Sequence, residues 1–116
     1  MNFIDNEYLI PIFIGDSAAN RKGASRIMKK TGIRAHFFAP RFLPFDGFRY
    51  SCHKVFPFRD ELISDRIVSF ANSVEEYYCP IILMCDDFAR QAVKRNSIPL
   101  ESACVAMDIE EFFSNL

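Results

Sequence analysis

The sequence predicts an α/β fold, a three-layer, Rossmann-like domain around a central, mostly parallel five-stranded sheet. Short apolar runs alternate with longer segments of helical period, which is the pattern of right-handed β-α-β units. The runs are apolar on both faces, as is typical of parallel strands that helices cover on both sides. A chain of 116 residues has room for one domain, and we assign residues 1–116 to it.

The first half of the chain predicts three strands and one helix. The strands are expected at residues 10–14, 33–39 and 48–56, and the last of them is the most polar. The helix is expected at 17–30, with Asp16 or Ser17 as its N-cap. Gly32 stands at the position of the C-cap. A loop with two prolines and a glycine, residues 40–47, separates the second strand from the third.

The second half predicts two strands and three helices. Its clearest element is a helix at 59–78, where apolar residues repeat at helical spacing through Tyr77 and Tyr78. A strand at 81–85 follows, and Asp86 caps a short helix that ends near residue 95. A fifth strand at 102–107 and a closing helix at 108–115 complete the chain.

Composition excludes several classes of protein. Fourteen basic residues face fifteen acidic ones, for a net charge of -1. This balance argues against nucleic-acid partners and against a polybasic membrane surface. Acidic residues precede the apolar run 8–14, so it does not resemble a signal peptide, and no run approaches the roughly 20 residues that span a bilayer. We therefore expect a cytoplasmic protein.

The cysteines and histidines do not predict a metal site or a nucleophile. The four cysteines (Cys52, Cys79, Cys85 and Cys104) are expected to be reduced thiols. Cys52 and His53 are adjacent in a strand, so their side chains point to opposite faces and cannot pair directly. A zinc site would need short-gap ligand pairs, which these residues lack. His36 lies within a strand and is expected to be packed.

The candidate site lies where parallel strands end. In open α/β sheets, ligands bind beyond the carboxyl ends of the strands, at the point where strand order reverses. From the residues at these strand ends, we select the following as substrate-binding candidates: Gly15, Asp16, Ser17, Arg41, Asp86 and Asp87. Backbone N–H groups at the two helix starts would bind an anion, and the carboxylates an amine. The alternative is that Asp16 and Asp86 are only helix caps, and the sequence leaves both open.

Tests for known nucleotide motifs fail. The dinucleotide fingerprint needs three glycines in the first turn, but Gly15 is followed only by Gly23. A phosphate-binding loop needs Gly-Lys-Ser/Thr, whereas Lys22 precedes Gly23 inside a helix. A receiver domain would need an aspartate after the third strand and a lysine after the fifth, where this chain has Phe56-Pro57 and Asp108. These tests argue against a classical dinucleotide-binding protein, a P-loop NTPase and a receiver domain, and we assign no catalytic residue.

Thirteen phenylalanines are unevenly spread, and no tryptophan is present. Seven crowd the second and third strands and the loop between them: Phe37, Phe38, Phe42, Phe45, Phe48, Phe56 and Phe58. They either form core, or form an apolar surface that docks another domain or a second copy of the chain.

Two stretches of the chain have a distinctive order of residues. The first is Ile12-Phe-Ile-Gly-Asp, a helix, and Thr31-Gly-Ile-Arg-Ala-His-Phe-Phe. The second is Phe48-Arg-Tyr-Ser, Lys54-Val-Phe-Pro, a long helix and Cys79-Pro-Ile-Ile-Leu-Met-Cys-Asp-Asp. Both resemble the pre-ATP-grasp domain, the N-terminal domain of ATP-grasp ligases such as D-aspartate ligase, biotin carboxylase and the large subunit of carbamoyl-phosphate synthetase. Residues 92–100 resemble the segment that closes the domain. Gly15 stands without the second loop glycine that many members have.

The resemblance implies a function. These ligases join a carboxylate to an amine through an acyl-phosphate made with ATP and magnesium, which domains after the N-terminal one bind. The chain would be the substrate-side N-terminal domain, inactive alone and without its own cofactor. Gly15, Asp16 and Ser17 would line the pocket, with Asp86 and Asp87 beside it. Its partners would be the remaining ATP-grasp domains, encoded beyond Leu116, and a small carboxylate or amino-acid substrate. The alternative is a stand-alone, Rossmann-like regulatory module for a small ligand or nucleotide.

Overall fold

The structure is a computed structural model, and it describes residues 8–15, 17–39, 52–57 and 63–115. Strands and helices alternate along the chain. The elements are β1 (Leu9–Ile14), α1 (Ala18–Thr31), β2 (Ala35–Ala39), β3 (Cys52–Pro57), α2 (Ile63–Ser73), β4 (Cys79–Met84), α3 (Asp87–Arg95), α4 (Ser97–Glu101), β5 (Val105–Asp108) and α5 (Ile109–Ser114).

The strands form one sheet in the order β3-β2-β1-β4-β5, and every neighbouring pair is parallel. The predicted α/β class, with a parallel sheet flanked by helices in a Rossmann-like topology, is confirmed. The chain winds from β1 outward to β3 and then crosses back to place β4 beside β1. Strand order therefore reverses between β1 and β4, as expected for the candidate site.

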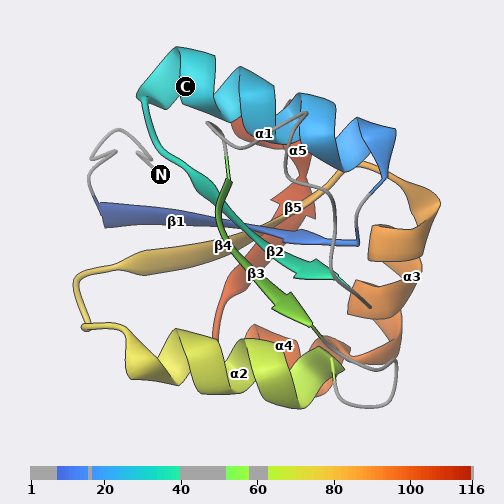
Figure 1. The fold of residues 1–116 in the computed structure, drawn as a ribbon. Coiled ribbons are helices and arrows are strands. Elements are labelled where there is room, and N and C mark those ends of the chain that lie inside the picture. The colour runs from blue at the N-terminus through green and yellow to red at the C-terminus, as the bar shows by residue number, and fades with distance from the viewer. Residues whose placement is uncertain (1–7, 16, 40–51, 58–62, 116) are drawn as a thin grey trace.

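Helices cover both faces of the sheet (Figure 1). α1 and α5 lie on one face, and α2 and α4 on the other, with α3 beside the carboxyl ends of the strands. Alternate strand residues supply the two cores, so Phe13, Phe37 and Leu83 pack under α1 and α5. Ile12 and Phe38 pack on the opposite side, in the core that includes Ile67 of α2 and Leu100 of α4. All six residues of β1 are buried, which makes it the centre of the domain.

α1 begins and ends where its sequence signals predict. The Ser17 side chain accepts a hydrogen bond from the Asn20 N–H, as an N-cap does. Gly32 has a φ of 76°, and its N–H donates to the Met28 carbonyl at 2.9 Å. This left-handed C-cap geometry favours glycine.

The prediction for α2 was wrong at its C-terminal end. The helix ends at Ser73, and a turn follows in which the Tyr78 N–H donates to the Glu75 carbonyl at 2.9 Å. The apolar period continues through Tyr77, but the Tyr77 side chain is 57% exposed. Tyr77 and Tyr78 both pack against the Tyr8 ring, with centroid distances of 5.1 and 5.7 Å.

The segment before β5 also differs from the prediction. Residues 97–101, to which the sequence assigned no element, form the short helix α4, and Pro99 fits its first turn because no helical N–H bond is needed there. The N–H groups of Ala103 and Cys104 then donate to the Leu100 carbonyl. This turn delays the strand, so β5 spans Val105–Asp108 rather than 102–107.

The two phenylalanines of β2 are core residues. Phe37 and Phe38 are fully buried on opposite faces of the sheet. Phe37 stacks on Phe13 with ring centroids 5.4 Å apart, and Phe38 meets Phe70 edge-on at 5.8 Å. The other clustered phenylalanines, whose core or docking role the sequence left open, lie outside the described side chains (Phe42, Phe45, Phe48, Phe56 and Phe58).

The close approach of α1 to the sheet depends on Gly23. A Cβ atom at this position would lie 2.7 Å from Ile109 Cδ1, 2.9 Å from Cys85 Sγ and 3.0 Å from Phe13 Cε1. Phe13 and Ile109 are core residues and Cys85 packs against them, so a Cβ atom here requires these side chains to shift within a closely packed region.

We therefore expect Gly23→Ala to destabilise the domain. Overpacking a filled core costs about 1–3 kcal/mol, which offsets the gain of about 1 kcal/mol that alanine brings to a helix interior. Urea unfolding measures the difference, and Lys22→Ala, on the exposed side of the same turn, is the control. A Gly23→Ala variant more stable than the parent would contradict this packing.

Candidate functional site

The carboxyl ends of β1 and β4 lie side by side and carry most of the predicted site residues. Gly15 follows β1 with a φ of 96°, a conformation that L side chains rarely adopt. Its N–H donates to the Phe38 carbonyl at 2.8 Å, so the turn is fastened to β2. The Phe88 ring lies 3.2 Å from the place of a Cβ atom on Gly15, and the Phe88 side chain is 44% exposed. Phe88 thus packs beside Gly15 at the switch point, and we call the position outside these two strand ends the crevice.

The Asp86 carboxylate connects the starts of two helices. Its Oδ1 accepts the Ala89 N–H at 2.8 Å, which caps α3. Its Oδ2 accepts the Ser17 hydroxyl at 2.5 Å, across 69 residues of sequence. The Ser17 oxygen in turn accepts the Asn20 N–H at 3.1 Å and caps α1. The structure therefore brings Gly15, Ser17 and Asp86 together, as predicted from the topology.

Asp86 caps α3, as predicted, and this position has an electrostatic consequence. Helix N-termini carry a partial positive charge that attracts anions. Here Asp86 supplies a negative charge to the starts of α1 and α3, where a ligand phosphate would otherwise bind. The crevice therefore disfavours a second anion and favours a hydrogen-bond donor or an ammonium group.

Asn20 is a polar residue of this region that sequence reasoning missed. It is fully buried, and its Nδ2 donates to the Ile14 carbonyl at 2.8 Å. Its Oδ1 has no hydrogen-bond partner. Residues 15, 17 and 20 have the spacing of the three glycines in the dinucleotide fingerprint, so Ser17 and Asn20 occupy the second and third glycine positions. The helical spacing of Asn20 from the buried Gly23, Ala24 and Ile27 was the signal that could have located it.

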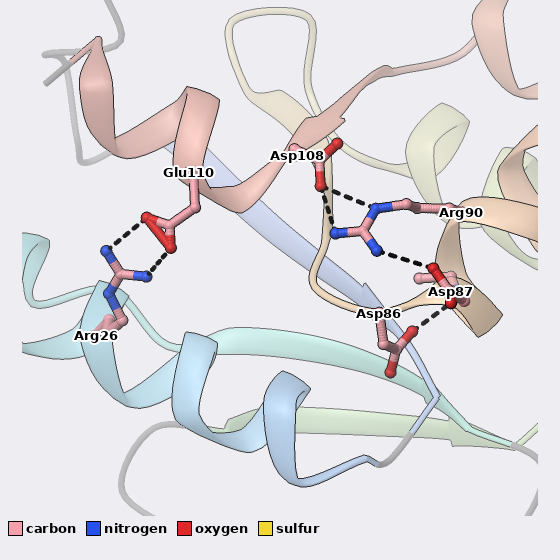
Figure 2. Close-up of polar contacts among 7 residues, drawn as sticks. Arg26, Asp86, Asp87, Arg90, Asp108 and Glu110 are labelled. Atoms are coloured by element: carbon pink, nitrogen blue, oxygen red, sulfur yellow. Dashed lines mark hydrogen bonds and ion pairs between the residues drawn. The ribbon is translucent and has the colours of Figure 1, made fainter.

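Arg90 organises the carboxylates at the outer edge of the site (Figure 2). Its guanidinium donates to Asp108 Oδ1 at 2.8 and 3.0 Å and to Asp87 Oδ1 at 3.2 Å. Asp87 is therefore partly neutralised, whereas the Asp86 carboxylate accepts from two neutral donors, the Ser17 hydroxyl and the Ala89 N–H. Two predicted site residues, Asp16 and Arg41, lie outside the described residues.

A second ion pair fixes the far side of α1. Arg26 donates to both carboxylate oxygens of Glu110 at 2.8 and 3.2 Å (Figure 2), and its guanidinium lies 4.0 Å from the centre of the Phe113 ring. The hydrogen bonds from Arg26 lower the pKa of Glu110. These contacts hold α5 against α1 and do not involve the residues of the crevice.

No nucleophile or metal centre emerges from the described side chains. Cys79, Cys85 and Cys104 are free thiols, and burial raises the pKa of Cys85 to about 12 and of Cys104 to about 11. These thiols remain protonated and unreactive at neutral pH. Among the described residues, no group of His, Cys, Asp and Glu could hold a metal ion. His36 packs 5.0 Å from the Phe70 ring, consistent with a packed histidine, and the side chains of Cys52 and His53 lie outside the described part.

Comparisons with known proteins give no relative. A scan against protein-family models, a search of curated proteins and a search of solved structures each found no match for this chain. Within the described ranges, no helix is long and apolar enough to cross a membrane.

A double-mutant cycle tests the contact between Ser17 and Asp86. We expect Ser17→Ala to lower the free energy of unfolding by about 1 kcal/mol through the lost α1 cap. Asp86→Asn keeps a capping oxygen for α3 but removes the charge that strengthens the bond to Ser17. The two changes should be coupled by about 1 kcal/mol, the net value of one such hydrogen bond. Urea unfolding of the four proteins measures this coupling, and strictly additive effects would contradict the contact.

The Cys85 thiol makes stability depend on alkaline pH. Its pKa is raised from 9.0 to about 12, first by burial and then by the Asp86 carboxylate. The folded state thus favours the neutral thiol, and this contribution is complete below the unfolded pKa and is lost as pH rises towards the folded one. Stability should therefore decrease above pH 9 more steeply in the parent than in Cys85→Ala. Urea unfolding across this range measures both slopes, and equal slopes would show that Cys85 ionises freely.

Proposed function

We propose that this chain is the substrate-side N-terminal domain of an ATP-grasp carboxylate–amine ligase, and that it is inactive alone. The resemblance in sequence spans nearly the whole chain and assigns the turn after β1 and the turn after β4 to one substrate pocket. The observation that carries the proposal is the hydrogen bond between Ser17 and Asp86, which joins those two turns. The three-layer, five-stranded form and a cytoplasmic location are what we expect of such a domain.

The negative charge of Asp86 at the crevice supports binding of the amine substrate by this domain and of ATP by the remaining domains. Ligation activates a carboxylate as an acyl-phosphate and then adds an amine. Asp86 disfavours phosphate at the switch point, so ATP and magnesium would be held by the other domains of the ligase. Asp86 and Asp87 suit the ammonium group of an amine or amino-acid substrate.

A second copy of the chain remains a proposed partner, whereas nucleic acid and membrane are not expected as partners.

The alternative function is a stand-alone module that binds a small ligand for regulation. The exposed Phe88 ring beside Gly15 favours it, because a ligand can stack there without any further domain. A nucleotide fits less well, since its pyrophosphate would meet Asp86 at the helix starts. A thermal-shift screen of the isolated chain separates the two, because a bound ligand stabilises the folded state by an amount that grows with the logarithm of its concentration over its dissociation constant. Stabilisation by a nucleotide and not by amino acids would favour the alternative.

The ligase proposal is tested on the full open reading frame. With ATP, magnesium, carboxylates and amino acids, hydroxylamine should trap the acyl-phosphate as a hydroxamate. We expect Asp86→Asn to lower kcat/KM for the amine by about tenfold, the equivalent of 1.4 kcal/mol, with little change in the KM for ATP.

Asp65→Asn, an exposed aspartate on α2, is the matched control. A reading frame that stops at Leu116 would overturn the ligase proposal. An active ligase in which Asp86→Asn and Asp65→Asn behave alike would instead overturn the assignment of Asp86 to the pocket.

A further inference from the structure

A cavity of about 540 Å³ lies at the opposite end of the sheet from the crevice. The start of β1, the turn between α1 and β2, and the C-terminal end of α2 line it, and in Figure 1 all three lie on the side of the domain where β1 and β4 begin. Its volume is within the range of small-molecule sites, which are mainly apolar with a few polar groups. Its apolar wall includes Ile10, Phe70, Val74 and Tyr78.

Two opposite charges line this cavity without neutralising each other. Arg34 comes from the turn before β2, and Glu75 from the turn after α2. In the part of the chain that the structure describes, neither forms an ion pair, whereas Arg26 and Arg90 are both paired with carboxylates. Both side chains are exposed, so they can reorient towards a ligand at little cost.

The aromatic wall is held in place by its neighbours. Tyr78 packs against Tyr8 and Tyr77, with ring centroids 5.7 and 4.9 Å away. Phe70 packs against His36 at 5.0 Å and against Phe38 at 5.8 Å. A ligand side chain would therefore meet a surface that is already ordered, which lowers the entropy cost of binding.

We propose that this cavity binds a free α-amino acid with an apolar or aromatic side chain. Its carboxylate would pair with Arg34, whose guanidinium can donate two parallel hydrogen bonds, and its ammonium group with Glu75. Its side chain would cover Phe70, Val74 and Tyr78. Because both charges are exposed, water still satisfies whichever of them a ligand leaves unpaired. A zwitterion forms a charge-assisted hydrogen bond with each of them, whereas a ligand with one charge gains only one such contact and an uncharged ligand gains none.

This site does not rest on the proposed function, because it shares no residue with the crevice and needs no ATP. The test uses the 116-residue chain at neutral pH with L-phenylalanine as the probe, followed by ¹H–¹⁵N NMR. Phenethylamine, which lacks the carboxylate, and 3-phenylpropionate, which lacks the ammonium group, are the matched ligands. We expect L-phenylalanine to shift the amides of Gly32, Ile33, Val74 and Glu75, and to bind about tenfold more tightly than either analogue.

Two variants assign the charges separately. Arg34→Met should weaken L-phenylalanine but not phenethylamine, and Glu75→Gln should weaken L-phenylalanine but not 3-phenylpropionate. Arg66→Met and Glu76→Gln, at exposed positions that do not line the cavity, are the controls and should bind as the parent does. Any of three results would overturn the proposal. These are equal binding of all three ligands, no chemical-shift change at the four amides, and an Arg34→Met variant whose affinity for L-phenylalanine is unchanged.

Discussion

The arrangement at the carboxyl ends of the strands depends on a single carboxylate. Asp86 accepts the Ala89 N–H with one oxygen and the Ser17 hydroxyl with the other, so it caps α3 directly and contacts the cap of α1. Because β1 and β4 are neighbours, the two helix starts lie close enough for one side chain to serve both. The same negative charge that stabilises the two helix starts disfavours the binding of the phosphate that a Rossmann-like fold commonly holds there.

The rest of that end of the sheet is built to keep α1 in this position. Gly23 lets α1 approach Phe13, Cys85 and Ile109 closely, and Arg26 holds Glu110 on the outer surface. Exposed ion pairs contribute little to stability, but the bidentate geometry of the Arg26–Glu110 pair orients α5 beside α1. Asn20 fills the space of a motif glycine and bonds to the end of β1, so the turn there has lost the open backbone that a dinucleotide requires.

Local signals in the sequence located the caps, and the order of elements located the crevice. Ser17, Gly32 and Asp86 were predictable because capping depends on residues within one turn. The end of α2 was not, since Val74, Tyr77 and Tyr78 continue its apolar period. The helix nevertheless ends at Ser73, and Tyr77 and Tyr78 pack on Tyr8 from a distant segment. The unpartnered oxygen of Asn20 was also unpredictable, because hydrogen bonding inside the fold depends on which carbonyl a side chain reaches.

The two ends of the sheet differ in how their charges are satisfied, and this difference limits what each can bind. At the carboxyl ends of the strands, Arg90 pairs with Asp87 and Asp108, and Ser17 at the start of α1 donates to Asp86. One cation among three carboxylates leaves this group of side chains with a net negative charge. At the amino ends, Arg34 and Glu75 line one cavity and neither is engaged by a partner in the described part. A group with a single positive charge suits the first place, and a group with both charges suits the second.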